Sequence, residues 1–289
     1  MTTAREWVAG ARPRTLALAV APVAVGTAAG ALDAPLIWWR AAAVLVVAVG
    51  LQVGANYAND YADGVRGTDD ERRGPLRLTA TGIAAPGAVK RAAFLSFGVA
   101  CAIGAVLALA VNPWLLVLGA ACVAAAWFYT GGSKPYGYSG WGEVAVLACF
   151  GFAATAGSAY VQAEATPAAA WWGALVVGLP ACAVLLANNV RDIETDRVAG
   201  KRTLAVRIGA APTRRLFVMC LVGAFLAVLP ITIDYPLALL AWLALPLAIG
   251  PARLVLTHDD PPSLVRALVG TVRLTLVLAA LLTLGLSLA

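Results

Sequence analysis

Two polar stretches interrupt an otherwise apolar chain, and both carry carboxylates at helical spacing. They are NYANDYADGVRGTDDERRGPLR (residues 56–77) and NNVRDIETDRVAGKRTLAVR (residues 188–207). Together they hold eight of the 15 acidic residues and nine of the 21 basic ones. Because uncompensated charge beside membrane helices is costly, such a concentration of charge indicates a functional site.

In each stretch an asparagine and two aspartates share one helical face, since residues three, four, seven or eight apart lie close together there. These residues are Asn56, Asp60 and Asp63 in the first stretch and Asn188, Asp192 and Asp196 in the second. Carboxylate oxygens suit Mg²⁺, which also binds substrate phosphates. We therefore predict that the two sets hold one diphosphate through bridging magnesium ions, with Asp69 continuing the first set. The alternative is a solvated loop whose acids and bases neutralise one another.

Basic side chains in the same stretches can contact diphosphate oxygens, for which arginine offers bidentate donors. The candidates are Arg72, Arg77, Lys201 and Arg202. A third polar connection, residues 129–143, contributes Lys134 as its only cation. It also contributes three tyrosines that could line the pocket of an aromatic substrate: Tyr129, Tyr136 and Tyr138. The alternative reading makes these cations orientation anchors and these tyrosines an interfacial belt.

Arg273 lies within a long apolar segment, about 10 Å along a helix beyond Arg266. An arginine inside a membrane segment is a candidate substrate contact, although its side chain could instead extend back to the interface. The five cysteines lie far apart in apolar runs without metal-ligand spacing. The sequence contains no Ser-His-Asp triad, zinc motif or P-loop pattern.

Membrane helices must position these residues, because 61% of the 289 residues are hydrophobic and only 12% are charged. About 20 apolar residues cross a bilayer as a helix, which satisfies its own backbone. We predict an all-α polytopic bundle that forms a single domain over residues 1–289. Its nine transmembrane helices are expected at 14–31, 39–58, 91–111, 113–129, 142–161, 169–188, 214–231, 236–254 and 266–288.

The distribution of positive charge predicts the orientation in the plasma membrane. Of the 21 lysines and arginines, 19 lie in the N-terminal segment, in the connections that follow the second, fourth, sixth and eighth helices, or at the helix ends that adjoin these segments. Since cytoplasmic loops carry the excess of Lys and Arg, we expect a cytoplasmic N-terminus, cytoplasmic polar loops and an outside C-terminus. The net charge of +6 then reflects orientation, and we expect no nucleic-acid partner. Both acidic stretches emerge on one side and can face each other across a common mouth.

Over essentially its full length the chain resembles the UbiA-type superfamily of intramembrane aromatic prenyltransferases, through the two acidic stretches. Within that superfamily it is most similar to the 1,4-dihydroxy-2-naphthoate polyprenyltransferases of menaquinone biosynthesis. The segments that carry this closer resemblance are NDYADGVRGTD (59–69), GPLR (74–77), Thr81-Gly82, YTGG (129–132) and RDIETDRVAGKRTLAVRIG (191–209).

The resemblance implies nine helices around a central cavity capped by cytoplasmic loops. It also implies Mg²⁺, a polyprenyl diphosphate donor and a 1,4-dihydroxy-2-naphthoate acceptor, which would give demethylmenaquinone with loss of the acceptor carboxylate. In this reading the four aspartates at 60, 63, 192 and 196 bind the metal, and Lys134, Lys201 and Arg202 stabilise the departing diphosphate.

Three other readings remain open from the residues alone. The acceptor could be hydroxybenzoate, homogentisate or a chlorophyllide-type ring. The protein could be an ion-coupled transporter, although transporters usually hold their charges near the bilayer midplane and these acids cluster at one interface. It could also be a non-catalytic quinone-binding scaffold, which would tolerate loss of the aspartates. The sequence makes no prediction of oligomeric state.

Overall fold

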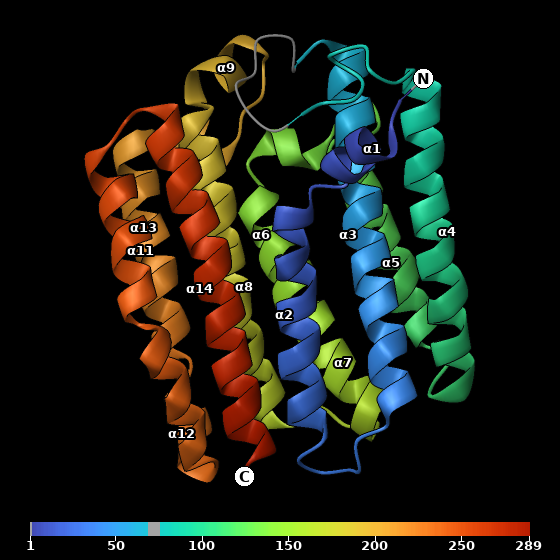
Figure 1. The fold of residues 1–289 in the computed structure, drawn as a ribbon, viewed down its shortest axis with the longest axis vertical. Coiled ribbons are helices and arrows are strands. Elements are labelled where there is room, and N and C mark those ends of the chain that lie inside the picture. The colour runs from blue at the N-terminus through green and yellow to red at the C-terminus, as the bar shows by residue number, and fades with distance from the viewer. Residues whose placement is uncertain (1, 69–75) are drawn as a thin grey trace.

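Apolar helices packed side by side form the protein in the computed structural model, which describes residues 2–68 and 76–289 (Figure 1). Those described ranges contain no β-strand, so the all-α prediction is confirmed. The longer helices are α2 (Pro13–Gly30), α3 (Trp38–Arg66), α4 (Pro86–Ala110), α5 (Leu115–Phe128), α8 (Ala168–Arg191), α11 (Ala210–Leu226), α13 (Pro246–Thr257) and α14 (Pro261–Ser287).

Shorter helical elements join these helices or cap one end of the bundle. They are α1 (Ala4–Gly10), the 3₁₀-helix η1 (Tyr136–Ser139), α6 (Gly142–Val146), the π-helix η2 (Leu147–Ala153), α7 (Ala154–Ala163), α9 (Ile193–Val198), α10 (Leu204–Ile208), α12 (Ile231–Asp234) and the 3₁₀-helix η3 (Pro236–Ala244). The elements α6, η2 and α7 follow one another without a break and together form a single apolar segment, Gly142–Ala163.

Every predicted apolar segment is helical, but the count of nine membrane spans is not confirmed. Within the described part of the chain, six helices are long and apolar enough to cross a bilayer, and up to eight if two bent pairs each form one span. Those pairs are α1 with α2, bent by 53°, and η3 with α13, bent by 44°. The remaining predicted span, at 113–129, corresponds to the 14-residue α5. At a rise of about 1.5 Å per residue, such a helix is shorter than a hydrocarbon core of about 30 Å.

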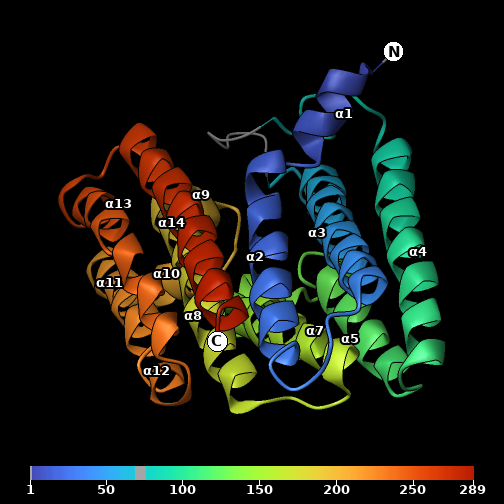
Figure 2. The ribbon, with the colours of Figure 1, turned by 60° about the horizontal axis from the view of Figure 1, so that its bottom comes forward.

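Helix α2 lies between α14 and α3 in both views and packs against each of them (Figures 1 and 2). The largest buried apolar cluster joins α2, α8, α11 and α14, and includes Val25, Val177, Phe217 and Leu278. A second cluster packs α3 against α4 around Tyr57 and Phe97. Between these two clusters the bundle encloses a cavity.

The two acidic stretches lie at the same end of the bundle. The first is at the C-terminal end of α3, and the second spans the end of α8 and the short helix α9, both near the top of Figure 1. The N-terminus lies at this end and the C-terminus at the opposite end (Figure 1). The fold therefore brings together two stretches that are more than 100 residues apart in the sequence.

Candidate active site

A cavity of about 1210 Å³ runs between the helices from the polar end into the apolar interior. Its deeper wall is apolar and includes Val47, Leu51, Leu107, Leu115 and Leu118. Its charged lining residues, among those that the structure describes, are Arg12, Arg14, Asp63, Arg77, Arg191, Asp196 and Lys201. All seven belong to segments at the end where the acidic stretches emerge (Figure 1). The cavity thus has a charged mouth, in which the described cations outnumber the described carboxylates, and an apolar interior.

Asp63 is one of the carboxylates of this mouth and is only 3% exposed. Its Oδ1 atom accepts a hydrogen bond from the Tyr138 hydroxyl and lies 3.4 Å from Lys201 Nζ. Its Oδ2 atom lies 4.0 Å from Arg77 Nη2. Three distant parts of the chain therefore converge on one aspartate at the end of α3.

Tyr138, on η1, links this aspartate to the basic residues of the mouth. The Lys201 ammonium lies 4.7 Å from the centroid of the tyrosine ring, a cation–π distance. Burial, and then the negative charge of Asp63, raise the pKa of the Tyr138 phenol above its ordinary value of 10.0. The phenol consequently stays protonated at neutral pH and acts as a hydrogen-bond donor to the carboxylate.

Asn59 was not among the residues singled out from the sequence, yet it lines the cavity one turn before Asp63. Its Oδ1 atom accepts a hydrogen bond of 2.8 Å from the Thr130 hydroxyl. Arg66, also on α3, donates to the backbone carbonyls of Thr130 and Gly132. These contacts fix the 129–132 turn against α3. The signal that could have identified Asn59 is its spacing of four residues from Asp63, which repeats that of Asn188 and Asp192.

Asp60, a predicted metal ligand, does not line the cavity in this structure. It is 1% exposed, and its Oδ2 and Oδ1 atoms accept hydrogen bonds from the backbone N–H groups of Leu78 (2.8 Å) and Thr79 (2.9 Å). A carboxylate oriented in this way stabilises a turn of the chain. The turn that Asp60 holds carries Arg77, which contacts Asp63.

In the second acidic stretch, too, one aspartate lines the cavity and the other does not. Asp196, on α9, is 8% exposed and lines the cavity. Asp192 is 5% exposed and does not line it; both of its oxygens accept 2.7 Å hydrogen bonds from the Arg191 guanidinium. Arg191, which sequence reasoning missed, also donates to Asn188 Oδ1 at 2.7 Å and lines the cavity. The prediction that both acidic sets face one mouth thus describes the position of Asp63 and Asp196, and not that of Asp60 and Asp192.

Three predicted contacts do not line the cavity. Lys134 and Arg202 are exposed, and Arg202 lines a separate shallow basic hollow shared with Lys201. Arg273 is exposed on α14, because residues 271, 272, 274 and 275 of that helix face inward and leave it on the opposite face. Two further predicted residues, Asp69 and Arg72, lie outside the described residues.

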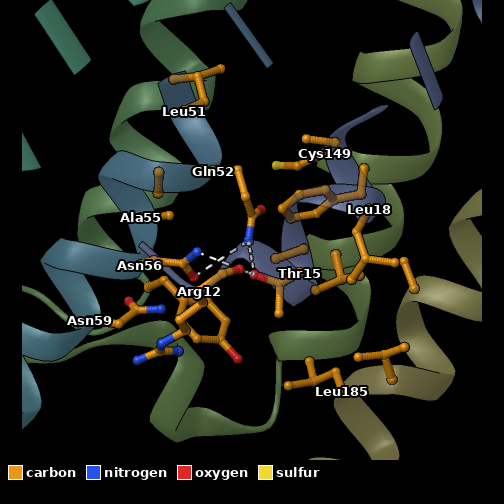
Figure 3. Close-up of a pocket in the computed structure, with 18 of the residues that line it drawn as sticks. Arg12, Thr15, Leu18, Leu51, Gln52, Ala55, Asn56, Asn59, Cys149 and Leu185 are labelled. Atoms are coloured by element: carbon orange, nitrogen blue, oxygen red, sulfur yellow. Dashed lines mark hydrogen bonds between the residues drawn. The ribbon is translucent and has the colours of Figure 1, made fainter. Parts of the chain in front are cut away.

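The remaining predicted binding residues do line the cavity. They are Asn56, Asn188, Arg77, Tyr129 and Lys201. Sequence reasoning also missed Arg12, which adopts a left-handed backbone conformation (φ 54°) at the bend between α1 and α2 and lines the cavity mouth (Figure 3). Non-glycine residues in this conformation are uncommon and cluster at binding sites.

Comparison with known proteins places this arrangement in a family. The family model described as the UbiA prenyltransferase family matches residues 19–277. The chain belongs to the UbiA prenyltransferase family. Its helical bundle is similar to the apo structure of a UbiA homologue from Aeropyrum pernix, with a TM-score of 0.71, 16% identity, and coverage of 94% of this chain and 98% of the other.

Curated UbiA relatives match at much higher identity. A 1,4-dihydroxy-2-naphthoate octaprenyltransferase of Mycobacterium tuberculosis is 48% identical over 256 residues, covering 88% of this chain and 88% of the relative. The protein of the same name from Escherichia coli is 37% identical over 298 residues, covering 97% of this chain and 94% of the relative.

A UbiA homologue from Archaeoglobus fulgidus bound to GPP and Mg²⁺ has a TM-score of 0.67 at 14% identity, covering 96% of this chain and 99% of the other.

The carboxylates at the mouth of this UbiA cavity suit a metal that is bound together with its substrate. In residues 2–68 and 76–289, no group of three or more His, Cys, Asp or Glu side chains forms a ready-made metal site. Magnesium seldom requires one, since it typically uses one or two carboxylates, several waters and the substrate phosphates. Asp63 and Asp196 supply two carboxylates on the wall of one cavity. The donor set therefore fits Mg²⁺ once a diphosphate completes it.

Proposed function

We propose that this UbiA-family protein transfers a polyprenyl group from polyprenyl diphosphate to 1,4-dihydroxy-2-naphthoate in menaquinone biosynthesis. The acceptor carboxylate leaves as carbon dioxide, and the direct product is the hydroquinone form, a demethylmenaquinol, which becomes demethylmenaquinone only on later oxidation outside this step. The choice of acceptor is supported by relatives at 37% and 48% identity that bear the name 1,4-dihydroxy-2-naphthoate octaprenyltransferase.

The observation that carries the proposal is the segregation of charge within the cavity. Among the described residues, five cations and two carboxylates line its mouth, and the deeper wall is apolar. This pattern matches a ligand with a polyanionic head and a hydrocarbon tail, since arginine and lysine bind phosphate oxygens and apolar walls bind isoprene units. A polyprenyl diphosphate is such a ligand.

In the proposed reaction the allylic carbon–oxygen bond of the donor breaks and diphosphate leaves. Asp63 and Asp196 would hold Mg²⁺, which when bound supplies positive charge that stabilises the leaving oxygens. Lys201 and Arg77 add preorganised positive charge next to Asp63, and the Tyr138 hydroxyl orients that carboxylate.

The apolar cavity wall then keeps water away from the allylic cation while the electron-rich ring attacks it. A new carbon–carbon bond forms at the ring carbon that bears the carboxylate. Loss of carbon dioxide restores the aromatic ring, so the step requires no strong base from the protein. Holding both reactants in one cavity supplies much of the rate advantage.

We also propose that the charged mouth faces the cytoplasm. The support is the positive charge around it, since cytoplasmic segments carry the excess of Lys and Arg. Water-soluble diphosphate would then leave on the side where it can be hydrolysed.

The test is a product assay on purified protein supplied with 1,4-dihydroxy-2-naphthoate, a polyprenyl diphosphate and Mg²⁺. We expect a prenylated, decarboxylated product by mass spectrometry and no product in excess chelator. Asp63→Asn should lower turnover about 100-fold or more, as loss of one preorganised electrostatic group does elsewhere. The matched control is Asp33→Asn, an exposed aspartate at the opposite end of the bundle.

Near-normal turnover of Asp63→Asn would contradict the role assigned to this carboxylate. Prenylation of hydroxybenzoate in place of the naphthoate would overturn the proposed acceptor. Ion flux in proteoliposomes without any prenylated product would overturn the enzymatic function.

A further inference from the structure

A closed hydrogen-bond network lies on the cavity wall below the charged mouth, where α2 meets α3 (Figure 3). Gln52 Nε2 donates to Thr15 Oγ1 (3.3 Å) and to Asn56 Oδ1 (3.4 Å). Asn56 Nδ2 donates to the Ala11 backbone carbonyl (2.9 Å) and to Thr15 Oγ1 (3.3 Å). The Thr15 hydroxyl in turn donates to the Arg12 carbonyl at 2.9 Å.

This network determines which way the two side-chain amides point. The Ala11 carbonyl can only accept, so Asn56 must direct its nitrogen there and its oxygen toward Gln52. The Thr15 hydroxyl uses its single hydrogen on the Arg12 carbonyl, so it also requires donors from its neighbours. Gln52 must therefore direct its nitrogen into the network, and both of its N–H groups are used there.

The consequence is that Gln52 Oε1 is left as an acceptor. Gln52 is only 7% exposed and lines the cavity, and its Oε1 atom has no hydrogen-bond partner within the described residues. Burying a carbonyl oxygen without a hydrogen-bond donor costs folding free energy. In native proteins such an oxygen usually accepts a hydrogen bond from a ligand or a water. The site therefore selects for a molecule that brings a hydrogen-bond donor.

The two substrates of the proposed reaction differ in this respect. The ionised diphosphate and the isoprenoid tail of the donor substrate offer acceptors and hydrocarbon, and no O–H or N–H group. The dihydroxynaphthoate acceptor carries two phenolic hydroxyls. We infer that Gln52 is an acceptor-recognition residue whose Oε1 atom accepts a hydrogen bond from a phenolic hydroxyl of the aromatic substrate. This inference rests on the proposed function and names the residue that orients the ring.

The surroundings of Gln52 suit a flat aromatic ring. Leu18, Phe150 and Leu185 line the same cavity and supply apolar surface for its faces. Gln52 precedes Asp63 by 11 residues on α3, which corresponds to about 16 Å along the helix. The ring would therefore lie deeper than the diphosphate, where the allylic carbon of the donor extends inward from the charged mouth.

The first test is Gln52→Met, which keeps the length of the side chain and removes its acceptor. We expect the KM for dihydroxynaphthoate to rise about tenfold, the size of one net hydrogen bond to a ligand, while the KM for the polyprenyl diphosphate stays unchanged. Leu45→Met, on the exposed face of the same helix, is the control and should change neither constant. Equal rises in both KM values, or an unchanged acceptor KM, would overturn the inference.

The second test starts from the wild-type protein, and its first measurement does not depend on the folding of a variant. Inhibition constants are measured for 1-hydroxy-2-naphthoate and 4-hydroxy-2-naphthoate, each of which lacks one hydroxyl of the acceptor. We expect one of them to bind about tenfold more weakly than the other, and Gln52→Met to abolish that difference. Equal inhibition by both analogues in the wild type would indicate that a water satisfies Gln52, and would overturn the inference.

The two proposals fail in distinguishable ways. Absence of any naphthoate product from the wild-type protein overturns the proposed function. Normal naphthoate prenylation together with an acceptor KM that is insensitive to Gln52→Met overturns only the role of Gln52.

Discussion

Asp60 and Asp63 stand one turn apart on α3 and have different surroundings. Asp60 binds two backbone N–H groups of the turn that carries Arg77, whereas Asp63 faces the cavity and contacts Tyr138 and Lys201. The first aspartate thus holds a loop in place, and the second is available to a ligand. A carboxylate that accepts two backbone N–H groups contributes mainly to folding.

Asp60→Asn should therefore lower stability. One of the two backbone N–H groups would face an amide NH₂ in place of an oxygen, at a cost of about 1–3 kcal/mol for the unsatisfied donor. Thermal unfolding of the purified protein in detergent measures this, and Asp33→Asn, at an exposed site, should show no change. Unchanged stability of Asp60→Asn together with weakened magnesium binding in calorimetry would restore Asp60 as a metal ligand.

Helical spacing alone could place Asn56, Asp60 and Asp63 on a common side of α3, and it could not separate their roles. Residues three apart differ by about 60° around a helix, which is enough for one to meet the turn at 78–79 and the other to meet the cavity. The partners of these side chains come from segments distant in the sequence. Arg12 and Gln52 escaped notice for the same reason, since only the packing of α2 on α3 brings them to the cavity wall.

Helix α2 approaches α7 closely through two glycines spaced four residues apart, a pattern that permits tight contact between membrane helices. A Cβ atom at Gly26 would lie 2.1 Å from the Thr155 carbonyl oxygen, and one at Gly30 would lie 2.7 Å from the Ala159 carbonyl oxygen. The same helix carries Thr15 and lines the cavity. Its close packing therefore helps to set the width of the binding site.

Gly26→Ala should destabilise the protein by about 1–3 kcal/mol, because the two helix backbones must move apart. Gly98→Ala is the matched control, since nothing lies within 4 Å of a Cβ added at that position of α4. The control should be neutral or stabilising, as alanine favours helix more than glycine does. Thermal midpoints of the two variants in one detergent compare them directly, and equal midpoints would argue against tight α2–α7 packing.

At the level of elements, apolar runs predicted where helices occur and did not predict their internal form. The predicted span at 142–161 contains the π-helix η2, whose Cys149, Phe150 and Ala153 line the cavity. Its Gly151 approaches Gly178 of α8, a contact between distant segments that hydropathy does not encode. Likewise, hydropathy could not reveal that α5 has only 14 residues of regular helix.

For the whole molecule, the distribution of basic residues predicts orientation more directly than the fold does. The two termini lie at opposite ends of the bundle, as expected for termini on opposite sides of a membrane (Figure 1). The packing of the helices is the same whichever end of the bundle faces the cytoplasm, so the fold does not determine the orientation. The charge asymmetry supplies that choice.

A tag fused to the C-terminus should accordingly be digested by protease added to intact spheroplasts. A tag fused to the N-terminus should become sensitive only after the membrane is permeabilised. Western blots for the two tags read out both results. The reverse pattern would invert the proposed orientation and place the cavity mouth outside the cell.

The gathering of all described charged cavity residues at one end has a consequence for energetics. In the proposed reaction the diphosphate would enter and leave through the same membrane face, and no ion would cross the low-dielectric core. We therefore expect turnover to be electrically silent, with a rate that does not depend on the transmembrane voltage or on the proton-motive force.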